Sequence, residues 1–120
     1  MAKTISILVP TYNEEENVVP LAEAIIELFH RELMPRYQYE LVFIDNDSKD
    51  DTRNKLRILC NKDSQIKAIF NAKNFGQFNS PYYGLQQTTG DCVILLCADF
   101  QDPIEMIPVF VQEWEQGYKI

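Results

Sequence analysis

The sequence lacks the features that mark membrane, secreted and nucleic-acid-binding proteins. Its longest uninterrupted apolar run, Cys92–Ala98, has seven residues, whereas a membrane-spanning helix needs about 20. No secretory apolar segment follows Met1, so a cytoplasmic location is expected by default. The net charge of −7 argues against the basic face that nucleic-acid binding requires.

Cysteine is also scarce. Cys60, Cys92 and Cys97 form no CxxC pair and are odd in number, which favours reduced, buried thiols over a disulfide or metal framework. No repeat, linker or low-complexity tract interrupts the 120 residues. That length fits one domain with one hydrophobic core.

Four short apolar runs predict strands, at residues 5–9, 41–44, 66–70 and 92–97. The first, second and fourth are nearly continuous in apolar residues, as in strands covered on both faces. The third alternates with polar residues, which suits a strand at the edge of a sheet.

Segments with helical periodicity lie between these runs. Apolar stripes over 18–29 and 56–60 predict two helices, and Pro20 is tolerable only in the first turn of the first one. A weaker pattern covers 77–89. The alternation of strand and helix predicts an α/β fold with a mostly parallel sheet.

A last helix is expected to open at Asp102-Pro103. Asp102 can cap it, Pro103 suits the first helical position, and Glu105 can close a capping box. Pro108 lacks the N–H group of a helix interior, so the helix should kink or restart there before it runs on to Gly117.

Polar clusters follow three of the four predicted strands, at residues 10–17, 45–52 and 98–103. Ligands of open parallel sheets bind outside the carboxyl ends of the strands, so the clusters should meet at one edge. The first two could equally be only turns and helix starts. Asp99 is harder to explain that way, because an unpaired carboxylate at the mouth of a core strand is costly.

The same clusters carry a resemblance. Residues 9–17 (VPTYNEEEN) are similar to the opening signature of family-2 glycosyltransferases, and residues 44–52 (IDNDSKDDT) stand where that family has Asp-Asp-Gly-Ser-x-Asp-x-Thr. Residues 73–91 resemble the segment before its fourth strand. Residues 98–103 (ADFQDP) resemble the end of its Asp-x-Asp motif, in a form common among polyprenyl-phosphate sugar transferases.

The resemblance implies a GT-A fold, a Rossmann-like sheet of four strands in the order 3-2-1-4 flanked by helices. It implies transfer of a sugar from a UDP- or GDP-linked donor to an acceptor, a polyprenyl phosphate. The nucleotide-sugar-binding residues that it implies are Pro10, Tyr12, Glu14, Ile44, Asn46, Ala98 and Asp99. Asp99 and Gln101 would hold Mg²⁺ or Mn²⁺, hard cations that prefer oxygen ligands and bridge phosphate oxygens.

Two positions depart from the family pattern. Cys97 replaces the first acidic residue of the Asp-x-Asp motif, and Asn46 replaces the second aspartate of the Asp-Asp-Gly-Ser motif. A thiol is a poor Mg²⁺ ligand, and an amide has different base preferences from a carboxylate. A catalytically silent nucleotide-binding or assembly module of the same fold is therefore an alternative to the enzyme.

Catalytic domains of this family are longer than this chain. The resemblance implies that residues 1–120 form the nucleotide-sugar-binding part. The catalytic base, the acceptor part and any membrane helices would then lie beyond it, and membrane association at the cytoplasmic face would come from the missing part. An exposed fourth strand at the sheet edge would also favour a homodimer or homo-oligomer.

Two other α/β classes fit less well. A receiver domain has this size, but it needs an acidic pair after its first strand, where this chain has Pro10-Thr11. A dinucleotide-binding enzyme needs a G-x-G-x-x-G turn at the same place, and none follows the first predicted strand.

Overall fold

A parallel sheet of four strands forms the centre of the molecule in the computed structural model, which describes residues 3–71, 90–96 and 104–117. The strands are β1 (Lys3–Thr11), β2 (Tyr37–Asn46), β3 (Ile66–Asn71) and β4 (Cys92–Leu95). Their order is β3-β2-β1-β4, which confirms the order expected from the resemblance and the edge position of the third strand.

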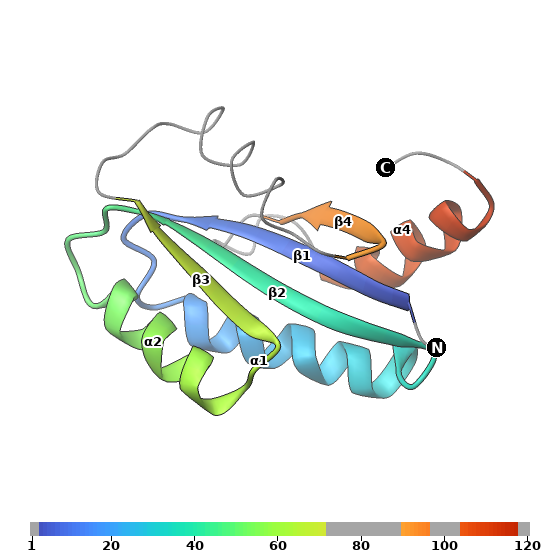
Figure 1. The fold of residues 1–120 in the computed structure, drawn as a ribbon, viewed down its shortest axis with the longest axis horizontal. Helices are drawn as coiled ribbons and strands as arrows, with labels where there is room; N and C mark the ends of the chain where they lie inside the picture. Colours follow the sequence, from blue (N-terminus) through green and yellow to red (C-terminus); the bar gives the residue numbers. More distant parts are fainter. Residues whose placement is uncertain (1–2, 72–89, 97–103, 118–120) are drawn as a thin grey trace.

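All pairs in this sheet are parallel, so the strands end toward the same edge. In Figure 1 the loops that follow β1 and β2 lie together at the left of the view. The register sets Thr11 beside Asp45 and Asn46 beside Asn71. We call this side the carboxyl edge of the sheet. Two of the three polar clusters of the sequence therefore come together there.

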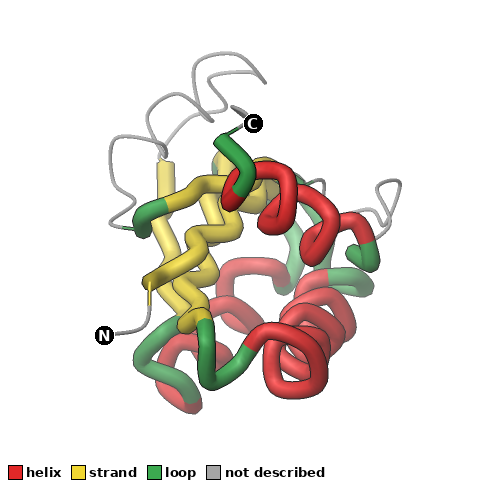
Figure 2. Tube along the Cα trace, turned by 90° about the vertical axis from the view of Figure 1, so that its right-hand side faces the viewer, coloured by secondary structure: helices red, strands yellow, loops and turns green. Residues whose placement is uncertain are grey.

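The helices are α1 (Val18–Leu28), which continues as the π-helical turn η1 (Phe29–Leu33), α2 (Thr52–Lys62) and α4 (Met106–Glu115). Figure 2 shows these helices, in red, on one side of the yellow strands. Pro20 is the third residue of α1, where no intrahelical bond needs its missing N–H. Within the described ranges, no helix combines the length and apolar character of a bilayer span.

Two apolar clusters cover the two faces of the sheet. The larger lies between sheet and helices and contains fully buried side chains such as Ile7, Phe43 and Ile25. The smaller lies on the other face, around Leu8 and Val42. We call the two sides the helix face and the second face. Because side chains alternate along a strand, every residue of β1 and β2 is assigned to one of them.

Two boundaries differ from the sequence-based expectation. Helix α4 begins at Met106, and Ile104 forms a turn before it, with its carbonyl accepting from the N–H of Ile107 at 2.9 Å. The helix start expected at Asp102-Pro103 is therefore wrong, and the capping box of Asp102 with Glu105 involves a residue outside the described ranges. Pro108 falls in the first turn, where a missing N–H has no cost, so the helix need not kink. Strand β4 ends at Leu95 instead of residue 97. The helix expected over 77–89 lies outside the described residues.

Candidate functional site at the carboxyl edge

Three of the residues that the family resemblance selects share the second face of the sheet. Pro10 of β1 pairs with Ile44 of β2, and Asn46 lies two positions further along β2, on the same face. The side chain of Ile44 is buried in the smaller apolar cluster, whereas Asn46 lies at the end of its strand. A ligand at this edge would meet the second face and the ends of both strands.

Tyr12 and Glu14 belong to the β1–α1 loop, residues 12–17. Tyr12 directly follows β1, and 47% of its surface is exposed. The Glu14 carboxylate accepts from the side-chain amide of Asn17 at 2.8 Å, and its backbone carbonyl accepts from the N–H of Val18 at the start of α1. The loop thus offers an exposed aromatic ring beside a half-buried carboxylate.

The remaining expected residues, Ala98, Asp99 and Gln101, lie outside the described part of the chain, as does Cys97. Strand β4 leads toward them. It runs parallel to β1 with Leu95 beside Leu8, and the N–H of Leu96 donates to the Leu8 carbonyl at 2.9 Å. The roles of these residues in binding donor and metal stay predictions.

A buried carboxylate in the Asp-Asp-Gly-Ser-like segment, to which the sequence analysis gave no binding role, connects the strands and loops at this edge. Asp45 is fully buried on the helix face, and its two oxygens accept from four donors. Oδ1 accepts from the hydroxyl groups of Thr11, at 2.9 Å, and of Ser48. Oδ2 accepts from the N–H of Ser48 at 3.0 Å and from Nε of Arg53 at 2.8 Å. We call Asp45 and its three partner residues, Thr11, Ser48 and Arg53, the Asp45 cluster.

Hydrogen bonds then join the β1–α1 loop to the β2–α2 loop, residues 47–51. The N–H of Asn13 donates to the Ser48 hydroxyl at 2.8 Å, and the Asn13 side-chain oxygen accepts from the N–H of Lys49 at 2.8 Å. The N–H of Glu14 donates to the Thr52 hydroxyl at 2.9 Å. These contacts hold Glu14, and Asn13 next to Tyr12, against the β2–α2 loop and the start of α2.

Asp50 adds a further link between the two loops. It accepts from the N–H of Glu15 at 3.3 Å and from the N–H of Thr52 at 3.0 Å, as well as from the Thr52 hydroxyl. Burial alone would raise the pKa of Asp50, but these hydrogen bonds outweigh it and lower the pKa below its usual value. The loop structure therefore favours the charged form of this carboxylate.

Each loop also has one residue in the left-handed region, Asn13 with φ of 53° and Asp47 with φ of 60°. Asn and Asp tolerate this region better than other non-glycine residues. Asp47 stands where the family pattern has glycine, so the backbone there keeps a conformation that glycine adopts without cost. The glycine in the pattern was the sequence signal for this turn.

The described residues do not by themselves make a metal site. No group of three or more His, Cys, Asp or Glu side chains in residues 3–71, 90–96 and 104–117 is arranged to hold an ion. Two of the nearby carboxylates are paired with cations instead: Asp45 with Arg53 at 2.8 Å and Asp47 with Lys49 at 2.9 Å.

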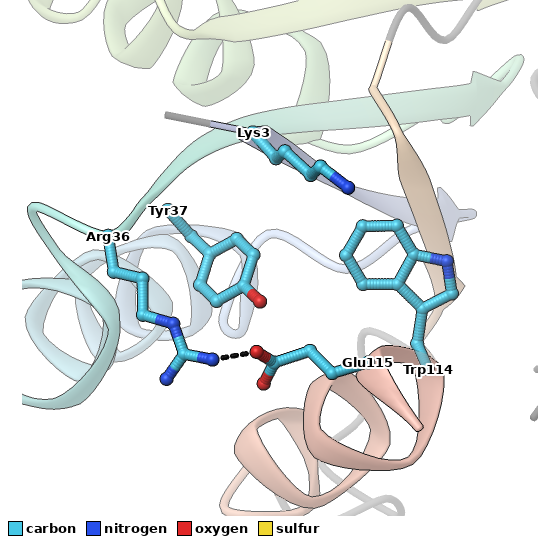
Figure 3. A pocket seen from close by; sticks show the side chains of 5 residues that line it. All are labelled: Lys3, Arg36, Tyr37, Trp114 and Glu115. Atoms are coloured by element: carbon cyan, nitrogen blue, oxygen red, sulfur yellow. Dashed lines mark ion pairs between the residues drawn. The ribbon is translucent and has the colours of Figure 1, made fainter. Parts of the chain in front are cut away.

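A separate cavity lies away from the carboxyl edge. A cavity of about 500 Å³ opens beside the amino ends of β1 and β2, as Figure 3 shows. Lys3 and Tyr37 begin those two strands, and Trp114, with Glu115, ends α4. Glu115 forms an ion pair with Arg36 across the cavity. None of the expected donor residues that the structure describes lines it, so we do not assign it to the donor site.

A parallel sheet with loops joined at its carboxyl edge is typical of open α/β proteins, whose ligands bind outside that edge. The model of glycosyl transferase family 2 matches residues 6–120. The chain belongs to this family, and its sheet has the GT-A arrangement.

The chain is similar in sequence to enzymes named for lipid-linked sugar transfer. It is 40% identical over 113 residues to a bactoprenol glucosyl transferase of Shigella phage SfX, covering 94% of this chain and 36% of that protein. It is 37% identical over 117 residues to an undecaprenyl-phosphate 4-deoxy-4-formamido-L-arabinose transferase of Proteus mirabilis, covering 97% of this chain and 35% of that protein. The chain thus spans about a third of the length of these relatives.

Solved structures share its fold at lower identity. A mannosyltransferase of Pyrobaculum calidifontis, in complex with GDP-Man and Mn²⁺, superposes with a TM-score of 0.62 and 22% identity over 86% of this chain and 34% of that one. S. aureus TarS in complex with UDP-GlcNAc gives a TM-score of 0.66 and 23% identity over 92% and 31%. At this identity the likeness concerns the fold alone.

Proposed function

We propose that the protein transfers a sugar from a UDP- or GDP-linked donor to a polyprenyl phosphate, with residues 1–120 as its donor-binding part. The observation that carries the proposal is the 40% identity to a bactoprenol glucosyl transferase over 94% of the chain. The match includes both loops that meet at the carboxyl edge. Such a transfer belongs to the synthesis of cell-envelope polysaccharide or glycolipid.

The chain's own residues supply binding and orientation in this proposal. Tyr12 offers an exposed ring to stack with the base, and Asn46 offers a side-chain amide to its polar edge. Pro10 and Glu14 complete the nucleotide pocket, with Ile44 beneath it and Ala98 near the ribose. The hydrogen bonds between the loops hold these groups before the donor arrives, which lowers the entropic cost of binding.

A divalent cation fits the donor set that the sequence offers. Asp99 and Gln101 would hold Mg²⁺ or Mn²⁺ through oxygen atoms, the ligands that these hard cations prefer. When bound, the cation would neutralise charge on the departing nucleoside diphosphate. An acidic protein of net charge −7 needs such mediation to accept a diphosphate.

A second candidate is a catalytically silent module that binds nucleotide or assembles with a partner. Cys97 favours it, because that position carries a carboxylate in the family pattern and a thiol binds Mg²⁺ poorly. Donor-dependent thermal stabilisation without sugar transfer would select this candidate over the enzyme.

The deciding experiment follows transfer of radiolabelled sugar from UDP-glucose and from GDP-mannose to undecaprenyl phosphate in detergent, with Mg²⁺, Mn²⁺ or EDTA. A thermal-shift panel of nucleoside diphosphates with and without Mn²⁺ runs in parallel. We expect cation-dependent stabilisation by UDP or GDP and weak response to ADP. Equal affinity with and without the cation would contradict the metal role.

Two variants test that role at the residue level. Asp99→Asn keeps the shape and removes the charge, so it should abolish cation-dependent donor binding and leave the fold intact. Cys97→Asp restores the carboxylate of the family pattern and should strengthen Mn²⁺ binding. If Cys97→Asp leaves the affinity unchanged while Asp99→Asn unfolds the protein, Asp99 has a structural role instead.

Association with partners completes the proposal. The acceptor is a membrane lipid, so the whole enzyme would work at the cytoplasmic face of a membrane. In the described part of the chain, β4 pairs with β1 on one side only, and Leu95 is 54% exposed. An open edge of this kind favours a homodimer or homo-oligomer. Sedimentation that gives only monomer at high concentration would argue against it.

A further inference from the structure

The Asp45 carboxylate has no room for a ligand. It is fully buried, and four donors already occupy its two oxygens. A carboxylate has about four lone-pair positions, so this set is complete. Asp45 also lies on the helix face of β2, whereas Asn46 beside it lies on the second face. Any effect of Asp45 on a bound donor must therefore act through its neighbours.

The hydrogen-bond partners of Asp45 are connected to both loops at the carboxyl edge. Thr11 ends β1, so its hydrogen bond to Asp45 joins the last residue of one strand to the other strand. The Ser48 hydroxyl donates to Asp45 and accepts from the N–H of Asn13 at 2.8 Å. Asn13 stands between Tyr12 and Glu14, two of the residues assigned to the donor.

Arg53 connects Asp45 to helix α2. Its Nε donates to Asp45 at 2.8 Å, and its guanidinium lies 5.2 Å from the ring centre of Phe70 in β3. Charge-assisted hydrogen bonds of this kind are shorter and stronger than neutral ones. One buried carboxylate thus connects three strands, α2 and two loops.

We propose that Asp45 is a positioning residue: it holds the β1–α1 and β2–α2 loops in the arrangement that binds the nucleotide, without contacting the nucleotide itself. The inference rests on the proposed donor-binding function. Losing the Asp45 charge should therefore weaken nucleotide binding and loosen both loops together, although no group that touches the ligand has changed.

The main variant is Asp45→Asn, which has the same shape. An amide has an NH₂ group in place of one carboxylate oxygen. An NH₂ group donates, so it cannot accept hydrogen bonds from donors such as Arg53 Nε and the Ser48 N–H. A milder test compares two variants of Thr11: Thr11→Val, which removes the hydroxyl group, and Thr11→Ser, which keeps it. The control is Glu40→Gln. Glu40 is also buried in β2, but it bonds to Ser6 and Lys67 within the sheet, away from the loops.

Three measurements on the full chain give the result: calorimetric Kd for UDP and GDP with Mn²⁺, amide hydrogen exchange at Asn13, Glu14 and Lys49, and urea unfolding. We expect Asp45→Asn to raise Kd about tenfold and Thr11→Val to raise it less, with Thr11→Ser unchanged. Exchange at the three loop amides should accelerate beyond that of core β1 amides. Glu40→Gln should lower stability and leave Kd within about twofold.

The outcomes separate the two proposals. If the unaltered protein binds neither nucleotide, the proposed function fails, and loop exchange in Asp45→Asn still tests the positioning role. If nucleotide binds and Asp45→Asn binds it equally well, the positioning role is wrong. Loop exchange that rises only as much as core exchange would also overturn it. If Asp45→Asn does not fold, the Thr11→Val and Thr11→Ser pair decides by the same criteria.

Discussion

Strand β2 carries two buried carboxylates that form similar contacts but connect different parts of the molecule. Glu40 and Asp45 are 2% and 0% exposed, and each bonds to a hydroxyl group and a cation. Glu40 lies within the sheet, where it accepts from Ser6 at 2.6 Å and pairs with Lys67 at 2.6 Å. We call these three residues the Glu40 cluster.

The difference lies in what each cluster joins. The Glu40 cluster connects β1, β2 and β3 at positions inside the strands, and the Ser6 hydroxyl also accepts from the N–H of Gly90 before β4 at 2.9 Å. It therefore holds strand to strand. The Asp45 cluster lies at the strand ends and connects strands to loops. In the Glu40 cluster the buried charge connects strands, and in the Asp45 cluster it holds the loops at the carboxyl edge.

The largest effect is expected where the Glu40 cluster loses its cation. Lys67→Met should lower the free energy of unfolding by about 2 kcal/mol, because it removes the cation that pairs with the buried Glu40 carboxylate; the Lys67 side chain is 50% exposed, so solvent screens part of the loss. Urea denaturation measures this. Lys49→Met is the matched control, since the Lys49–Asp47 pair is exposed and should contribute less than about 1 kcal/mol. Equal losses in the two variants would remove the contrast between the clusters.

A steric change tests how tightly β4 is held to the Glu40 cluster. A Cβ atom at Gly90 would lie 2.2 Å from the Ser6 hydroxyl oxygen and 2.9 Å from the Ser6 backbone nitrogen. Gly90→Ala should therefore cost about 2 kcal/mol of stability by overpacking. Thermal unfolding measures it, and Ser6→Ala in the same chain should recover part of the loss. Additive losses in the double variant would contradict the close approach.

A backbone change tests the loop side of the comparison. Asp47 has φ of 60°, so Asp47→Ala should be about 1 kcal/mol less stable than Asp47→Gly, which adopts this conformation freely. Both variants lose the same ion pair with Lys49, so their difference isolates the backbone. Denaturant unfolding of the two would show it. Equal stability would mean that the loop relaxes to another conformation.

The smallest effect concerns pH. The folded-state pKa of Asp50 is lowered, so its hydrogen bonds stabilise the fold above the ordinary aspartate pKa of about 3.9. That stability is lost as pH falls through the lower folded value. Asp50→Asn should flatten part of the acid limb of a stability profile taken below about pH 4. Identical acid limbs in both proteins would show that the loop hydrogen bonds do not couple to folding.

The sequence predicted much of the sheet because its signals are local. Continuous apolar runs identified the two central strands, and the alternating run at 66–70 identified an edge strand. The Asp45 cluster could not be found this way. Thr11 contacts Asp45 only through the register of two parallel strands that are separated by a helix in the sequence. The residue types at 45–52 were equally consistent with an ordinary turn and helix start. Glu40 could not be predicted as part of a cluster either, because its partners Ser6 and Lys67 are distant in the sequence.

The start of α4 differs from the expected one because capping residues alone do not determine where a helix begins. Asp102-Pro103-Ile104-Glu105 has the residues of a helix start, but the helix begins at Met106. Pro108 explains the outcome, since it is best placed in a first turn.

The place of β4 beside β1 has a consequence for the order in which the protein folds. The hydrogen bond from the Thr4 N–H to the Asp91 carboxylate joins residues 87 positions apart, whereas Ser6 and Glu40 are 34 apart. Closing a longer loop costs more entropy, and non-local pairing slows folding. Strands β1 and β2, with the loops joined through Asp45, can therefore assemble while the later part of the chain is still being synthesised. The two loops at the carboxyl edge would then be joined to each other before β4 takes its place beside β1.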